Sequence, residues 1–305
     1  MYSSSKRLRG ILPALITPFD EDGSVDPGLF TTQVDYLVGE GVDGFFVTGT
    51  TSEGAFLTND ERVRLVKLVK ERTADSLLCC VAVLAPDTSS VLRGFDTVAG
   101  LAPDFVSAVT PFYLGVSPRD VVHHFVTLAD RSPAPLILYN IPQNSHNALE
   151  LATVLELADH PNIAGIKDSG GVFMSFQRGL LATGDRDFTW IQGEDLLDAP
   201  ALLMGARCIV TGLGNAWIEP YVSMYRAATD GDASEVISAQ QRINELFRII
   251  PESGGAGLAA IKSAAALQGR STPRMRIASM QLSAEQEARV AAVLEELGLD
   301  VSVAG

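Results

Sequence analysis

The chain has 305 residues, of which 47% are hydrophobic and 20% are charged, a composition that fits a globular protein and argues against intrinsic disorder. Its formal net charge of -14 would repel a polyanion, so we expect no nucleic-acid partner. No apolar run is long enough to span a bilayer, and the basic amino terminus is not followed by a signal-peptide core. The three cysteines match neither a disulfide framework nor a metal site. We therefore expect a cytoplasmic protein with no membrane contact and no bound metal.

Short apolar or β-branched runs recur along the chain and predict β-strands. Their starts lie roughly 20 to 35 residues apart, which is the length of one strand, one helix and two loops. Eight such runs are present, at residues 11–16, 44–48, 77–83, 105–109, 136–139, 163–167, 189–192 and 208–211.

The intervals between these runs carry helical periodicity, for example at Phe30, Val34 and Leu37. Strands that alternate with helices imply a parallel sheet, and eight such units fit a closed (β/α)8 TIM barrel. After about Pro220 only helical patterns remain, at 238–250, at 257–267 and after a capping signature at Ser283. We divide the chain into a barrel with the catalytic site, residues 1–225, and a C-terminal helical appendage, residues 226–305.

Lys167 lies near the carboxyl end of the sixth predicted strand. It shares a strand face with Ile163 and Gly165, where the glycine leaves space beside the amine, while Asp168 points to the other face. Burial disfavours the ammonium form, so this lysine can present a free amine that forms a Schiff base with a carbonyl group. The alternative is a structural lysine whose stem packs under apolar neighbours while its amine reaches solvent.

Other polar residues follow the predicted strands at the end where barrel enzymes carry their chemistry. The second strand runs into residues 48–54, Thr-Gly-Thr-Thr-Ser-Glu-Gly, whose backbone N–H groups and hydroxyls suit a carboxylate, although an ordinary capped turn is an alternative. The fifth strand ends at Tyr139, one strand from Lys167. A phenol there can shuttle the protons of imine formation, or it can simply cap the barrel by packing.

Four motifs taken together resemble one family. They are residues 49–53 (Gly-Thr-Thr-Ser-Glu), 109–113 (Val-Thr-Pro-Phe-Tyr), 139–142 (Tyr-Asn-Ile-Pro) and 165–168 (Gly-Ile-Lys-Asp). In order and spacing they are similar to motifs of the dihydrodipicolinate synthase and N-acetylneuraminate lyase superfamily. The resemblance implies a class I lyase on a TIM barrel, independent of metals and cofactors, that acts on small-molecule 2-oxo acid and aldehyde substrates.

The resemblance also implies roles for individual residues. Lys167 would form the Schiff base with pyruvate or a longer 2-oxo acid, and Tyr139 would be the proton shuttle. Thr50 would act in the proton relay, joined across a subunit interface by Tyr113, which implies a homo-oligomer, either a dimer or a tetramer. The residues expected to bind substrate are Thr51, Gly49, Asn144, Gly193 and Thr211.

Two positions depart from the synthase pattern. Asn144 stands where the synthases have an arginine that grips the carboxylate of the second substrate, and asparagine supplies neither the charge nor the fork. Ser52 replaces a glycine, which matters if that position needs a positive φ.

Other stretches, at 128–133 and 160–171, look like those of 4-hydroxy-2-oxoglutarate and 2-keto-3-deoxy sugar acid aldolases. We therefore expect aldol cleavage or condensation, or dehydration, of a 2-oxo acid of that type. One alternative is dihydrodipicolinate synthase, which condenses pyruvate with aspartate semialdehyde. Another is a catalytically silent barrel that binds a 2-oxo acid.

Overall fold

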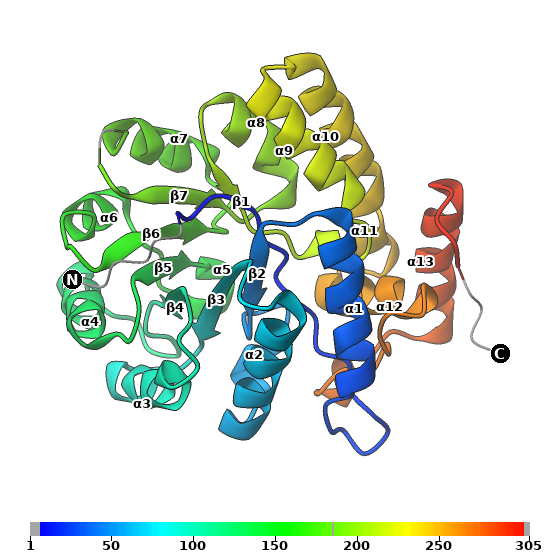
Figure 1. The fold of residues 1–305 in the computed structure, drawn as a ribbon, viewed down its shortest axis with the longest axis horizontal. Helices are drawn as coiled ribbons and strands as arrows, with labels where there is room; N and C mark the ends of the chain where they lie inside the picture. Colours follow the sequence, from blue (N-terminus) through cyan, green and yellow to red (C-terminus); the bar gives the residue numbers. More distant parts are fainter. Residues whose placement is uncertain (1–6, 185, 302–305) are drawn as a thin grey trace.

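The computed structural model describes residues 7–184 and 186–301. Its strands form one parallel sheet in the order β1-β8-β7-β6-β5-β4-β3-β2 (Figure 1). The strands are β1 (Gly10–Ile11), β2 (Gly44–Val47), β3 (Leu78–Val83), β4 (Phe105–Val109), β5 (Leu136–Asn140), β6 (Ile163–Asp168), β7 (Thr189–Gln192) and β8 (Cys208–Ile209). A bridge between Ala14 and Phe46 joins the segment after β1 to β2. The sheet is thereby closed, and the predicted (β/α)8 barrel is confirmed.

The first strand is shorter than the predicted run at 11–16, because Pro13 interrupts it and proline has no N–H to donate. The segment nevertheless stays bonded to both neighbours. The Ala14 amide donates to the Thr211 carbonyl at 2.8 Å, and the Phe46 amide donates to the Pro13 carbonyl at 2.9 Å. The seam of the barrel is therefore closed by a bent, proline-containing segment.

Helices surround the barrel (Figure 1). Four of them start where a side chain caps the free N–H groups of the first turn, namely Asp26, Thr58, Asp87 and Ser117. The ring consists of α1 (Pro27–Glu40), α2 (Asn59–Thr73), α3 (Thr88–Ala99), α4 (Pro118–Arg131), α6 (Leu151–Leu157), α7 (Phe173–Ala182), α8 (Asp198–Leu203) and α9 (Glu219–Asp230), and the short α5 (Pro142–Ser145) follows β5. The loops of the described residues also contain the 3-10 turns η1 (Gly54–Phe56), η2 (Asp195–Leu197), η3 (Leu213–Asn215) and η4 (Ala278–Met280).

The apolar residues form two layers because successive strand residues point to opposite faces. Leu138 of β5 belongs to the layer between strands and helices, whereas Tyr139 belongs to a second cluster with Phe46 and Ile191. Tyr139 pairs in register with Lys167 on β6. The fold therefore carries both side chains on neighbouring strands at the same level of the barrel.

The C-terminal region contains α10 (Ala233–Phe247), α11 (Ile249–Glu252), α12 (Gly257–Leu267) and α13 (Ala284–Glu296). The predicted start of the first of these at residue 238 is wrong, because Asp232 caps Ser234 and Glu235 and the helix begins at Ala233. α10 ends at Phe247, and Pro251 lies in the first turn of the separate helix α11, where its missing N–H needs no partner. The capping box at Ser283 is confirmed.

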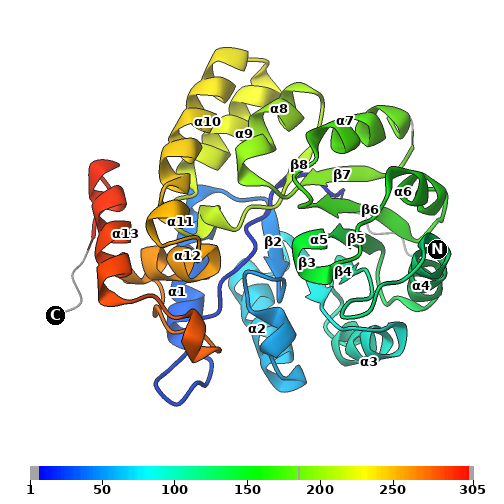
Figure 2. The same ribbon diagram turned by 180° about the vertical axis from the view of Figure 1, so that it is seen from behind.

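Figure 2 shows α12 between the barrel and α13, which is the outermost helix. Residue 225 lies inside α9, so we propose that the division between barrel and C-terminal region falls at Gly231, directly after that helix.

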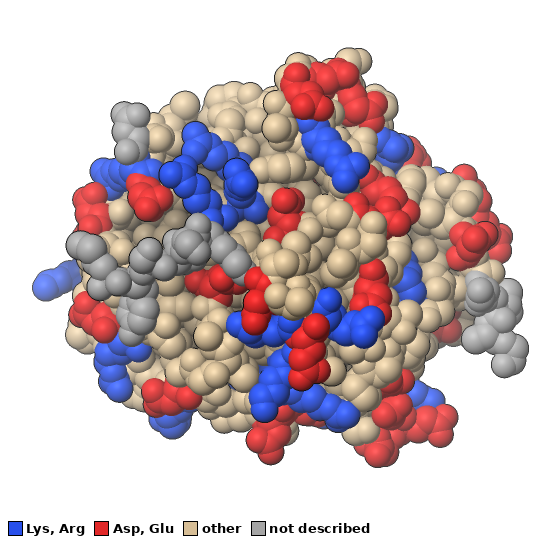
Figure 3. Space-filling model, viewed as in Figure 1, with Lys and Arg blue, Asp and Glu red and all other residues tan. Residues whose placement is uncertain are grey.

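Acidic and basic side chains are intermixed on the face shown in Figure 3. In the described part of the chain, every helix is too short or too polar to traverse a bilayer.

Candidate active site

Lys167 is buried near the carboxyl end of β6, with 5% of its surface exposed. Its Nζ lies 4.0 Å from the centroid of the Tyr139 ring and 4.9 Å from that of Phe46. Within the described residues no hydrogen bond or ion pair holds this amine, since the adjacent Asp168 carboxylate instead accepts from Asn140 at 2.8 Å and from the Gly170 amide at 2.9 Å. The lysine is thus held by aromatic faces while its amine stays uncommitted.

Tyr139 and Thr50 form a hydroxyl pair beside this amine. The phenol oxygen lies 3.2 Å from Thr50 Oγ1, and the tyrosine is only 2% exposed. Phe46 meets the Tyr139 ring edge-on, with centroids 5.8 Å apart, which restricts the orientation of the ring. A group that can pass protons therefore lies next to the candidate nucleophile.

Gly193, at the end of β7, borders Lys167 directly. A Cβ at this position would lie 3.2 Å from Lys167 Cε and 2.4 Å from Ser169 Oγ, so a side chain here would press on the lysine stem. For Gly165 the structure supplies a different reason from the expected space beside the amine. A Cβ there would lie 2.2 Å from the Thr189 carbonyl oxygen, so glycine is needed for the close pairing of β6 with β7.

Thr211 and Asp195 belong to a buried polar group whose charge interacts with that of Lys167. The Thr211 hydroxyl and the Tyr221 hydroxyl, the latter at 2.8 Å, both donate to Asp195 Oδ1. Burial raises the pKa of Asp195, while those two hydrogen bonds and the charge of Lys167 lower it. Thr211 also accepts from the Gly214 amide at 2.8 Å, so the structure engages its hydroxyl within the protein.

The other predicted site residues occupy different surroundings. A Cβ at Gly49 would lie 2.8 Å from the Phe46 ring, and the half-buried Thr51 faces Gly212 after β8. Asn144 is exposed on α5. Tyr113 is 88% exposed and has a φ of 79°, so the single chain does not bring it into the buried group around Lys167.

A pocket of about 480 Å³ opens beside Thr50. Asn144 and Ser145 contribute to its wall, as do Leu258 of α12 and Met280 of η4 from the C-terminal region. Lys167 and Tyr139 do not line it, but Thr50 borders it and contacts the Tyr139 hydroxyl.

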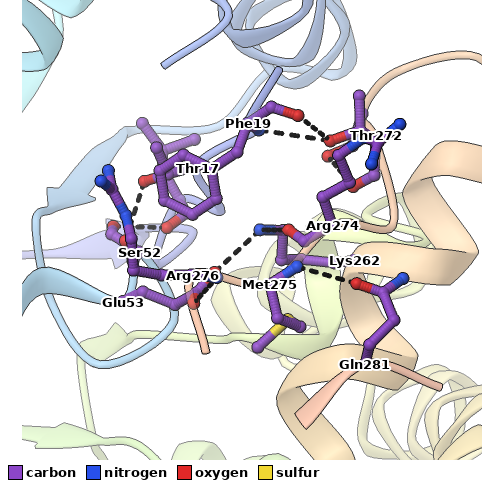
Figure 4. A network of polar contacts seen from close by, with 12 residues as sticks. Thr17, Phe19, Ser52, Glu53, Lys262, Thr272, Arg274, Met275, Arg276 and Gln281 are labelled. Atoms are coloured by element: carbon purple, nitrogen blue, oxygen red, sulfur yellow. Dashed lines mark hydrogen bonds and ion pairs between the residues drawn. The ribbon is translucent and has the colours of Figure 1, made fainter. Parts of the chain in front are cut away.

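Glu53 is a residue that the motif analysis did not single out, and it connects the site to the C-terminal region (Figure 4). Its Oε1 accepts from Lys262 Nζ at 2.8 Å, and its Oε2 accepts from the Arg276 amide at 2.8 Å. Lys262 also donates to the Arg274 carbonyl and lies over the Phe19 ring. Burial lowers the pKa of Lys262, and the Glu53 carboxylate opposes that shift. Because 209 residues separate the two partners, no local sequence pattern could have paired them.

Comparisons with known proteins identify the family. The model of the dihydrodipicolinate synthetase family matches residues 7–297. The chain belongs to that family. It is 31% identical over 287 residues to 4-hydroxy-tetrahydrodipicolinate synthase of Methanosphaerula palustris, covering 93% of this chain and 98% of the relative. It is 30% identical to the Mycobacterium leprae enzyme of the same name, covering 98% and 95%.

Solved structures of the dihydrodipicolinate synthetase family share this fold. That of dihydrodipicolinate synthase from Bacteroides thetaiotaomicron has a TM-score of 0.88 at 26% identity, covering 95% of this chain and 98% of that one.

The serine at position 52 leaves the turn after β2 intact, because the positive φ angles of this turn fall at Thr48 and Glu53. Ser52 is buried, and its hydroxyl donates to the Leu15 carbonyl.

Proposed function

We propose that this member of the dihydrodipicolinate synthetase family is a Schiff-base-forming lyase that acts on pyruvate or a longer 2-oxo acid. The observation that carries the proposal is the buried, uncommitted amine of Lys167 beside the Tyr139–Thr50 hydroxyl pair. A catalytically silent barrel would not need a lysine to be buried without a partner, and this favours a catalytic role.

In the proposed reaction Lys167 attacks the keto carbon of the 2-oxo acid and forms a carbinolamine, which loses water to become an imine. Tyr139 gives and takes the protons of these steps, and Thr50 connects its phenol toward the pocket. With pyruvate, the imine loses a proton from its methyl carbon, and that carbon can then bond to an aldehyde. Cleavage of a 4-hydroxy-2-oxo acid follows the same steps in reverse.

The relatives bear on the choice between the two finer hypotheses. They carry the name 4-hydroxy-tetrahydrodipicolinate synthase, and this favours the synthase alternative over the expected 4-hydroxy-2-oxoglutarate or sugar acid aldolase. Asn144 nevertheless differs from the synthase pattern at the residue that would grip the second substrate. Parallel assays separate the two hypotheses, one with pyruvate and aspartate semialdehyde and the other with 4-hydroxy-2-oxoglutarate.

Borohydride reduction in the presence of pyruvate tests the central step. Peptide mapping should locate the reduced adduct on Lys167 and not on Lys262, which is also buried but paired with Glu53 and so serves as an internal control. A folded protein without an adduct on Lys167 would refute the mechanism.

We also propose that the protein is a homo-oligomer in which a neighbouring subunit covers Tyr113. This side chain and Leu114, which is 69% exposed, place apolar surface next to each other at a loop with backbone strain. Sedimentation of the wild type and of Leu114→Glu should show a dimer or tetramer that the substitution dissociates. A monomeric wild type that turns over substrate would exclude this role of Tyr113.

A further inference from the structure

The pocket beside Thr50 indicates what kind of second substrate the protein takes. Thr50 belongs both to the pocket wall and to the hydroxyl pair next to Lys167. A substrate held as an imine on Lys167 can therefore extend past Thr50 into this space of about 480 Å³. The part that enters is the half contributed by the aldehyde, so the pocket wall selects the aldehyde.

Apolar side chains make up most of this wall. Leu84, Val109 and Ile141 lie at the carboxyl ends of β3, β4 and β5. Phe56 is 47% exposed and Met280 is 40% exposed, so both present apolar surface to the open pocket. A ligand that covers them removes this surface from water, which favours binding of an apolar group.

The wall offers no positive charge to an anionic substrate. Within the described residues no lysine or arginine lines the pocket, and its one ionisable residue, Glu53, has both oxygens bonded to Lys262 and Arg276. The Lys262 side chain is 0% exposed, so its ammonium does not reach the pocket. A carboxylate or phosphate entering here would lose water without gaining a cationic partner.

Few polar side chains are available for a hydroxylated substrate either. The Ser145 hydroxyl accepts from Thr110 at 2.9 Å and donates to the Asn147 carbonyl at 3.1 Å. Asn144 is the polar side chain of the wall for which the described residues provide no hydrogen bond. A polyhydroxylated chain would leave most of its hydroxyls without side-chain partners, which is unfavourable in a desolvated pocket.

We infer that the second substrate is an aldehyde with an uncharged alkyl or aryl body and at most one neutral hydrogen-bonding group, which reaches Asn144. The inference rests on the proposed Schiff-base chemistry and departs from both finer hypotheses, because aspartate semialdehyde and the glyoxylate half of 4-hydroxy-2-oxoglutarate each carry a carboxylate. In the reaction, the methyl carbon of Lys167-bound pyruvate loses a proton and bonds to the aldehyde carbon, and the aldehyde oxygen takes up a proton. Water then releases the 4-hydroxy-2-oxo acid and regenerates the amine.

A matched pair of aldehydes tests this inference, namely pentanal and 5-oxopentanoate, which share a chain length and differ in the terminal carboxylate. For pyruvate-dependent condensation, we expect kcat/KM with pentanal to be at least about tenfold higher. Asn144→Arg adds a cation at the pocket and should lower this ratio by about tenfold or more. Leu181→Ala, at a 65% exposed position on α7, is the control and should leave the ratio unchanged.

Borohydride trapping of pyruvate is run on the same samples, so that two failures can be told apart. One outcome is that the adduct forms on Lys167. Equal rates, a preference for 5-oxopentanoate, or no reaction with either aldehyde then overturns the inference about the aldehyde, while the Schiff base stands. If no adduct forms, the proposed function itself fails.

Discussion

The buried ion pair between Glu53 and Lys262 supports a quantitative prediction. The two side chains are 1% and 0% exposed, and the pair joins the turn after β2 to α12. Lys262→Met would leave the Glu53 carboxylate buried with the Arg276 amide as its one remaining partner among the described residues. Removing one member of a buried pair typically destabilises a protein by about 3–5 kcal/mol, because the remaining charge stays desolvated.

Replacing both members should cost much less, since Glu53→Gln with Lys262→Met leaves no unpaired buried charge at this position. We expect the double variant to be more stable than Lys262→Met alone, with a coupling energy of about 2–3 kcal/mol in a double-mutant cycle. Urea denaturation of the four proteins measures the free energy of unfolding. Glu21→Gln is the control, because Glu21 is 91% exposed in its pair with Arg274 and should contribute about 0–1 kcal/mol.

The same variants report on the site, because Thr50 lies in the turn that Glu53 anchors. We expect Lys262→Met to lower the rate of pyruvate adduct formation, and the double variant to recover part of it. A loss below about 1 kcal/mol in Lys262→Met, or single-variant losses that simply add in the double variant, would refute the reasoning.

Three further predictions follow from the site and its surroundings. Tyr139→Phe should slow imine formation by roughly 10²- to 10⁴-fold in a trapping time course, and an unchanged rate would mean that the proton takes another route. Gly193→Ala places a Cβ 3.2 Å from Lys167 Cε, so we expect about a tenfold lower rate of adduct formation at nearly native stability, whereas wild-type kinetics would show that the lysine stem adapts. Burial raises the pKa of Asp198 well above its ordinary value, and neither carboxylate oxygen has a hydrogen-bond partner among the described residues. The unfolded carboxyl therefore ionises above its pKa of about 3.9 while the folded carboxyl keeps its proton, so wild-type stability falls as the pH rises through this range. Asp198→Asn should gain Tm relative to wild type above that pH and not below it, and a constant Tm difference would contradict this.

The chain order of strands and helices could be predicted because its causes are local. β4 and β7 have the predicted bounds, since turn residues flank each apolar run. Capping boxes made the start of α13 readable in the same way. The predicted bounds were wrong at β8, which ends at Ile209 and not at residue 211, and at β1 and the start of α10, where Pro13 and the Asp232 cap decided the outcome.

By itself the sequence determined the barrel, the lysine near the end of the sixth strand and the tyrosine one strand away, because strand alternation and motif spacing act over a few residues. Only the tertiary structure paired Glu53 with Lys262 and put Gly193, not Gly165, against the lysine stem. It also brought Leu258 and Met280 into the pocket. These contacts join residues that are apart in the chain, so they depend on how the elements pack.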